Sequence, residues 1–412
     1  MVLKIDISLL IRCFGIFCVA FFLCSCAHTL DEDRAQAITE QDMDLSTREI
    51  FVLESGKCTA HIPTSAKLSF VGDNVLGDYK GSSGQTFNAK FAEVNEDFAY
   101  FSAGVREVLL SDDLTIGNME GVLSDKNLKN AFEKPFSFKG TSRYTEILKI
   151  AGFEALNVAN NHSRDYGAQG FQDTIEHLSN AGLAVFGEGI IHLYEVNGIR
   201  FGLAGHRGWN LGIKSQVKKE IDLLRSKGAD IVIFTFHWGE ERMHYPNAAQ
   251  RELAHFTIDS GADMVIGHHP HVLQGIEEYK GKKIVYSLGN FIYGGAKNPS
   301  DKDTMIYQTH FIKLDSRQDR KEFLEELRFD VCAREAYLNK DYIPNIERID
   351  TIEDFVLIHS IIPASISSTP SHNDYSPKIY EKDSAPYRRV LQRMQQYSTL
   401  KNQAKSLKKS RK

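Results

Sequence analysis

Cysteine is scarce in this chain, and its distribution limits what it can do. Of the six cysteines in 412 residues, four lie close together at the amino end: Cys13, Cys18, Cys24 and Cys26. Cys58 and Cys332 remain, and two cysteines could form one disulfide outside the cytoplasm but no disulfide framework. A packed core must therefore hold the fold, and contents of 42% hydrophobic and 25% charged residues are ordinary for a globular protein.

A surplus of positive charge is also missing. The chain has 49 Lys and Arg against 54 Asp and Glu, a formal net charge of -5. No nucleic-acid partner is expected, because such proteins usually carry a basic footprint. The exception is the stretch 388–412, which contains many basic residues and no acid. Such a tail is usually a solvated or frayed helix end, and less often a contact for an anionic polymer or a lipid headgroup.

Residues 1–25 are expected to be a targeting signal rather than part of the fold. A basic start leads into the apolar run SLLIRCFGIFCVAFFL, which only Arg12 interrupts. The run ends in Leu23-Cys24-Ser25-Cys26, which resembles a bacterial lipobox with Cys26 as the lipid acceptor; a plain signal peptide or an uncleaved anchor is the alternative. A lipid on Cys26 would hold the protein on a membrane surface without spanning it. We therefore expect an extracytoplasmic lipoprotein of the bacterial cell envelope.

Residues 26–66 are polar and acid-rich and are expected to form a tether. Over 67–300, short apolar strands alternate with helical segments, which predicts an α/β fold with helices covering the sheet. The expected strands are 67–71, 114–118, 155–158, 231–236 and 264–266. The expected helical segments are 91–110, 142–150, 170–181, 214–227 and 248–260. The dipeptide Asn197-Gly198 between 193–196 and 200–204 predicts a hairpin with a type I′ turn.

The pattern changes after residue 300. Residues 305–314 and 323–332 alternate like antiparallel strands, and a loop rich in serine and proline follows. We expect a small C-terminal β-containing extension with a loop over 301–384, and a basic helical or disordered tail over 385–412. The sequence contains no internal repeat.

Five of the expected strands end in side chains that bind metals. These side chains are Asp73, Glu120, Asn161 with His162, His237, and His269 with His271. Strand carboxyl ends are where open α/β sheets gather their active-site groups. Two carboxylates, a carboxamide and four imidazoles on one rim predict a metal site.

Six short motifs surround these residues between positions 67 and 294. They are Gly72-Asp73, Asn118-Met119-Glu120, Asn160-Asn161-His162 with Asp165-Tyr166-Gly167, His237-Trp238-Gly239-Glu240, Gly267-His268-His269-Pro270-His271, and Tyr286-Ser287-Leu288-Gly289-Asn290-Phe291. In this order they resemble the CapA family of bacterial capsule-synthesis proteins, which look like divergent calcineurin-type metallophosphoesterases. The resemblance implies a β-sandwich core flanked by helices. It also implies a role in assembling poly-γ-glutamate or a similar anionic polymer, together with other capsule-assembly membrane proteins.

The motif residues suggest roles. The expected metal ligands, for one or two ions of Mn, Fe or Zn, are Asp73, Glu120, Asn161, His237, His269 and His271. Glu120 could bridge two cations or act as a general base, and His162 could donate a proton to a leaving group. Asn118, Arg164 and Asn290 are expected to contact the substrate.

Two departures from the wider phosphoesterase pattern leave alternatives open. That pattern has a histidine two residues after the first aspartate, where this chain has Val75, and a bridging aspartate where this chain has Glu120. One metal, an altered pair, or a site kept for binding without hydrolysis would fit. The function is therefore either a metal-dependent hydrolase, in capsule assembly or outside it, or a non-catalytic subunit that binds a polyanion for export.

The lipobox-like motif predicts that Cys26→Ala moves the protein from the membrane fraction to a soluble or unprocessed form. Fractionation and gel migration of the two proteins measure this. If the variant fractionates and migrates like the wild type, the lipoprotein interpretation is wrong.

Overall fold

The structure is a computed structural model that describes residues 49–51, 59–61, 64–132, 134–329, 349–352 and 354–398. The expected signal segment, the lipid acceptor Cys26 and the pair Cys58 and Cys332 lie outside the described residues, as does most of the expected tether. Within these ranges, none of the helices combines the length and the apolar character needed to cross a membrane.

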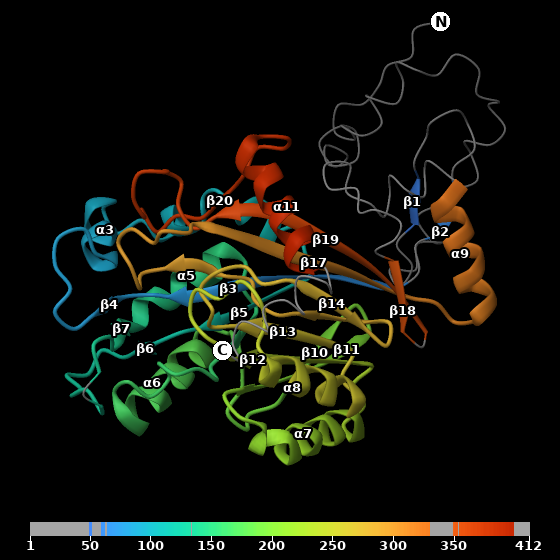
Figure 1. Cartoon of the computed structure of the whole chain (residues 1–412), viewed down its shortest axis with the longest axis horizontal. Coiled ribbons are helices and arrows are strands. Elements are labelled where there is room, and N and C mark those ends of the chain that lie inside the picture. The colour runs from blue at the N-terminus through green and yellow to red at the C-terminus, as the bar shows by residue number, and fades with distance from the viewer. Residues whose placement is uncertain are drawn as a thin grey trace, which may run out of the picture.

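Two β-sheets stacked face to face form the body of the molecule (Figure 1). The larger sheet runs β18-β19-β17-β3-β5-β8-β9, with β16 added beside β3 and β20 beside β19. Its strands are β3 (Ser65–Val75), β5 (Leu114–Met119), β8 (Ala155–Asn157), β9 (Ala184–Phe186), β16 (Asn290–Tyr293), β17 (Asp303–Lys313), β18 (Ile349–Ile352), β19 (Phe355–Ser365) and β20 (Lys378–Ile379).

The smaller sheet runs β10-β11-β12-β13-β15-β14. Its strands are β10 (His192–Val196), β11 (Ile199–Arg207), β12 (Ile231–His237), β13 (Met264–His268), β14 (Ile276–Tyr279) and β15 (Lys282–Val285). The facing sides of the two sheets share one buried apolar cluster, in which Phe70 and Ile116 of the larger sheet join Phe201 and Ile233 of the smaller. Burial of this shared face drives the two sheets together.

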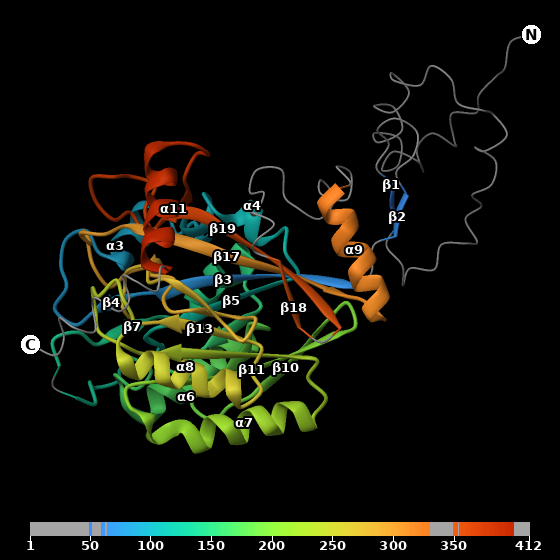
Figure 2. The ribbon, with the colours of Figure 1, turned by 45° about the vertical axis from the view of Figure 1, so that its right-hand side comes forward.

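Helices cover the two outer faces. α7 (Lys214–Ser226) and α8 (Ala248–Asp259) bury their apolar sides against the smaller sheet, and Figure 2 shows both helices below β13. The helices on the larger sheet are α3 (Phe87–Glu93), the 3-10 helix η2 (Phe98–Ser102), α4 (Arg106–Leu109), α5 (Thr145–Ala151) and α6 (Gly167–Asn180). This arrangement confirms the expected α/β fold with a β-sandwich core flanked by helices.

The expected hairpin is confirmed. β10 and β11 pair antiparallel with Val196 opposite Ile199. Asn197 and Gly198 both have positive φ, at 49° and 74°, which is the requirement of a type I′ turn.

The expected helix over 91–110 was wrong as a single element. α3 ends at Glu93, and Asn95 and Glu96 then adopt φ of 55° and 60°, which an α-helix does not allow. The side chain of Asp97 accepts a hydrogen bond from the Ala99 N–H and so starts η2. A local capping interaction thus outweighs the apolar periodicity.

The expected strand over 323–332 was also wrong over 323–329, and 330–332 lie outside the described residues. Residues 317–329 form α9 (Arg317–Phe329), because Glu, Lys, Leu and Arg dominate this stretch and favour a helix. Phe323 packs in a small cluster with Ile312 and Val356.

The strand expected over 305–314 is β17, and it lies inside the larger sheet. β17 pairs antiparallel with β3 on one side and with β19 on the other. The described part of the expected basic tail is α11 (Ala385–Ser398), which contacts β17 and β19 of one sheet and β14 of the other. Arg389 and Arg393 of this helix bind the buried carboxylate of Asp303.

The position of β3 depends on a glycine. A Cβ on Gly72 would lie 2.1 Å from the carbonyl oxygen of Gly289, and the next residue, Asp73, donates its N–H to that same oxygen at 3.0 Å. Only a residue without a side chain allows this close approach. Gly72 therefore fixes where the following aspartate lies.

We predict that Gly72→Ala lowers the free energy of unfolding by about 3 kcal/mol, because the clash is with backbone that cannot move aside. Gly182→Ala is the matched control. Nothing lies within 4 Å of a Cβ at Gly182, so only the strain of its left-handed backbone, roughly 1 kcal/mol, should appear. Urea unfolding measures both variants, and equal losses would refute the steric argument.

Candidate metal centre

The carboxyl ends of strands from both sheets meet at one end of the sandwich. In the larger sheet, parallel pairing of β3 with β5 puts Asp73 beside Asn118. In the smaller sheet, parallel pairing of β12 with β13 puts His237 beside His268. The two sheets touch here, since Nδ1 of His237 lies 3.8 Å from Oδ1 of Asp73. Parallel strands thus bring together side chains far apart in the sequence.

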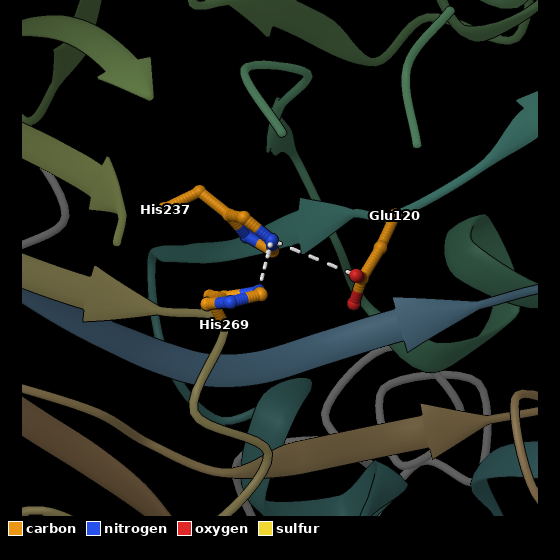
Figure 3. A group of neighbouring side chains, drawn as sticks. All are labelled: Glu120, His237 and His269. Carbon is orange, nitrogen blue, oxygen red and sulfur yellow. Dashed lines mark hydrogen bonds and ion pairs between the residues drawn. The ribbon is translucent and has the colours of Figure 1, made fainter. Parts of the chain in front are cut away.

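Two groups of buried side chains at this end could hold a metal ion. One contains Glu120, His237 and His269, which point toward one another in Figure 3. The other contains Asp73, Glu120 and His271. Within each group, one ligand atom from each residue lies within 4.8 Å of the others. Glu120 belongs to both groups, so it could contribute to either.

Glu120 has an unusual environment. Its side chain is fully buried, and neither carboxylate oxygen has a hydrogen-bond partner among the described residues. Its Oε1 lies 3.6 Å from Nε2 of His237, 3.8 Å from Nε2 of His162 and 3.9 Å from Nε2 of His271. Burial raises the pKa of Glu120 to about 8, with His271 opposing and Asp73 adding to the rise. Because a buried carboxylate without a partner is costly, this pocket fits a cation.

Asp73 is held as an anion. It accepts hydrogen bonds from Nδ2 of Asn118 at 2.7 Å and from the His269 N–H at 3.1 Å. Burial by itself would raise the pKa of Asp73, but the hydrogen bond from His271 and the nearby His237 and His268 lower it below the ordinary value.

His271 carries the opposite charge. Burial by itself would lower its pKa, but Glu120, Asp73 and a hydrogen bond to Asn290 raise it to about 10. Nδ1 of His271 lies 2.8 Å from Oδ1 of Asn290. Without a metal, His271 therefore serves as the cation that Asp73 and Glu120 face.

The other ligand-type histidines are neutral at neutral pH. Burial lowers the pKa of His237 well below its ordinary value, and burial with His271 lowers that of His269 to about 4. Neutral imidazole is the form that binds metals. Nε2 of His237 lies 2.7 Å from Oδ1 of Asn161, so Asn161 also faces this group.

The backbone around Pro270 is strained. His269 has φ 96° and His271 has φ 57°, conformations that cost of order 1–3 kcal/mol for residues with side chains. Such strain persists only where the surroundings impose it, and here the His269 N–H is held by Asp73. With this backbone, both imidazoles have a ring nitrogen within 4.8 Å of a Glu120 oxygen.

His162 is oriented by a neighbour. Its Nδ1 lies 2.8 Å from Oδ2 of Asp165, which also accepts the Phe138 N–H at 2.8 Å. The Lys134 ammonium forms an ion pair with the other oxygen of Asp165. Nε2 of His162 is left facing Glu120. A histidine with one nitrogen anchored and the other turned to the site has the geometry of a general acid or base.

Two residues expected to contact substrate are otherwise engaged. Asn118 is fully buried and joins Asp73 to Nδ1 of His237, while the guanidinium of Arg164 lies 4.1 Å from the centre of the Phe171 ring. Their substrate contacts stay predictions. Asn290 does lie at the site, through His271. Val75, at the position of the wider family's histidine, packs in an apolar cluster with Phe138 and Tyr293.

Sequence reasoning missed Trp209. Its ring centre lies 4.7 Å from that of His269 and 5.7 Å from that of His237, yet 45% of the residue is exposed. It lines a hollow of about 360 Å³ that reaches Asn161 and His269. None of the six motifs contains it, because Trp209 follows β11, whereas His237 ends β12 and His269 follows β13. The spacing of His162 and Asp165, three residues apart, could have signalled their pairing.

We predict that Glu120→Gln leaves the metal-free protein within about 1 kcal/mol of the wild type or makes it more stable, because burial raises the pKa of Glu120 and favours its neutral form, and its oxygens accept no hydrogen bond from the described residues. The matched control is Asp263→Asn. Asp263 is equally buried but binds Arg225, Lys282 at 2.9 Å and the Val232 N–H at 2.8 Å, so we expect a loss of about 1–3 kcal/mol. Urea unfolding with a chelator measures both, and a larger loss for Glu120→Gln would contradict the assignment.

Residues 67–294 are similar to known proteins of bacterial capsule synthesis. The family model described as "Bacterial capsule synthesis protein PGA_cap" matches residues 67–205 and 196–294. The PGA biosynthesis protein CapA of Bacillus subtilis (strain 168) is 32% identical over 282 residues, 63% of this chain and 71% of that protein. The capsule biosynthesis protein CapA of Bacillus anthracis is 35% identical over 237 residues, 51% of this chain and 57% of that protein.

One solved structure, of a hypothetical protein from Thermus thermophilus, covers 60% of this chain and 93% of its own at 16% identity, with a TM-score of 0.35. That likeness is too weak to identify a common fold. The family match is different in kind, because it spans more than half of the chain and every strand end that contributes to the metal centre. This chain therefore belongs to the bacterial capsule synthesis family PGA_cap.

Proposed function

We propose that this protein serves capsule or poly-γ-glutamate biosynthesis and does so through a metal-dependent, phosphoesterase-like hydrolytic site. The biosynthetic process is supported by the CapA relatives, which are named for it. The site is supported above all by Glu120, a fully buried carboxylate without a hydrogen-bond partner that belongs to two possible ligand groups. A bound cation would contact the Glu120 oxygens, which accept no hydrogen bond from the described residues.

The donor set indicates the kind of metal. Carboxylates and imidazoles together suit Mn, Fe or Zn. Two ligand groups that share Glu120 favour a pair of ions, with Asp73 and His271 in one group and His237 and His269 in the other. When bound, such ions would polarise a phosphoryl or amide centre and activate water at neutral pH.

The chain's own residues supply the proton chemistry. Nε2 of His162 faces the site, and Asp165 fixes its Nδ1. In our proposal His162 gives a proton from Nε2 to the leaving group, and Asp165 keeps the ring in that orientation. Asn290 orients His271, and Trp209 shields His269 from water on one side.

A second candidate is a non-catalytic subunit that binds an anionic polymer for export. Val75 favours it, because this position carries a packing side chain where the wider phosphoesterase pattern has a histidine. A hydrolase outside capsule assembly is the remaining alternative, and the substrate it accepts would separate it from the first.

The proposal includes a location. The apolar leader and Cys26 support a lipid anchor on the outer side of a membrane. There the protein would meet an anionic polymer, polyglutamate or similar, and the other membrane proteins of capsule assembly.

Two histidine variants test the hydrolytic site. We predict that His162→Ala keeps the fold and most of the metal but lowers turnover by roughly 10²–10⁴-fold, the usual contribution of a general acid. His269→Ala should lose metal and turnover together, because it removes a ligand. Metal content is measured by elemental analysis, and turnover is measured on a generic phosphodiester and on poly-γ-glutamate.

The control is His255→Ala. His255 pairs with Glu277 and stacks on Tyr279 outside the metal centre, so metal and turnover should match the wild type. Wild-type metal content and turnover in all three variants would remove the hydrolytic site from the proposal. A wild-type protein that holds no metal and hydrolyses neither substrate would favour the binding subunit.

A further inference from the structure

A second, larger hollow of about 1030 Å³ lies beside the metal centre. The small sheet β4-β7-β6 contains β4 (Asp78–Tyr79), β6 (Val122–Leu123) and β7 (Phe138–Gly140), and its strands β4 and β7 contribute one wall of the hollow. The loop between β6 and β7 forms the other. Neither the metal ligands nor the proton donor uses this hollow.

The described lining of the hollow is basic. It includes Lys80, Lys129, Lys134 and Lys139 against one acid, Asp78. Oδ1 of Asp78 already accepts the Phe87 N–H at 2.8 Å, at the start of α3. Even with Lys134 paired to Asp165, lysines outnumber acids in the described lining, and this favours an anionic ligand.

Two of the four lysines are available for a ligand. Lys80 and Lys129 are exposed, and within the described ranges neither ammonium has a hydrogen-bond or ion-pair partner. Lys139 is partly engaged, since its Nζ donates to the Lys126 carbonyl at 2.7 Å.

Lys134 connects the hollow to the metal centre. Its Nζ forms the ion pair with Asp165 and lies 3.0 Å from the Asn161 carbonyl oxygen and 3.3 Å from Nδ1 of His162. The same side chain lines the hollow. A ligand in the hollow would therefore lie one side chain away from the proposed proton donor.

The size and the apolar lining indicate what kind of anion fits. A single phosphate is usually held by donors that converge on one point, whereas these lysines are spread around a large volume. Phe132, which is 60% exposed, also lines the hollow. The ring centre of Phe136 lies 5.1 Å from that of Tyr79, another lining residue. Lysines with exposed aromatic rings suit a flexible chain that carries several carboxylates joined by methylene groups.

We propose that this lysine-lined hollow is the binding groove for a polycarboxylate chain, and that Lys134 marks where the groove meets the metal centre. The inference rests on the proposed function and adds to it the surface on which the polymer lies. The proposed binding does not depend on whether the protein cuts the bound chain.

The test is polymer binding by the full-length protein with Lys80 and Lys129 reversed in charge. Fluorescent poly-γ-glutamate of defined length is the probe, and fluorescence anisotropy at low salt gives Kd. We expect Lys80→Glu with Lys129→Glu to weaken binding at least about tenfold, since two attractive contacts become repulsive. The neutral pair Lys80→Gln with Lys129→Gln should fall between this variant and the wild type.

The matched control is Lys219→Glu with Lys227→Glu. Both lysines are exposed, at α7 and just after it on the outer face of the smaller sheet, and the change in net charge is the same. The control should bind like the wild type. If the control weakens polymer binding as much as the groove variant does, or if the groove variant binds like the wild type, the proposed groove is wrong. Binding is read whether or not the protein hydrolyses anything, so failure of the hydrolytic site shows separately, in metal content and turnover.

Discussion

A buried carboxylate without a partner is the constraint on which the rest of this site depends. Glu120 lies fully buried where two sheets meet, and both its oxygens lack a hydrogen bond among the described residues. Such a group adds nothing to the stability of the metal-free protein, because burying a carboxyl group without hydrogen bonds is costly. Among its neighbours, Glu120 and Asp73 hold His271 in its charged form, whereas burial keeps His237 and His269 neutral.

The fold creates this environment for Glu120 by placing two sheets against each other, so that their parallel strands end at the same place. β3 and β5 supply Asp73 and Glu120, and β12 and β13 lead into the histidines. Asn118 joins the two sheets, because one amide group reaches both Asp73 and His237. The left-handed backbone at His269 shows that the site, rather than local backbone preference, determines this turn.

Features with local signals could be predicted from the sequence, whereas those that depend on distant partners could not. Apolar runs such as the one ending in Asp73 mark strands and their carboxyl ends, where the candidate site lies, and Asn197-Gly198 marks its own turn. β17 fits between β3 and β19 through sheet pairing that no short pattern records. α9 depends on helix propensity in a stretch that also alternates. Trp209 and His269 are far apart in the sequence, and only the folded chain brings their rings together.

Lys134 shows how one residue can belong to two environments. One side of its ammonium is bound to Asp165, which orients His162, the proposed proton donor. The other side opens on a hollow that three further lysines make basic. At the buried end, around Glu120, positive charge is scarce. At the open end, in the hollow, positive charge is in excess. An acidic chain would therefore be drawn to the open end first, and its passage toward the buried end would require cations at the centre to balance the carboxylates already there.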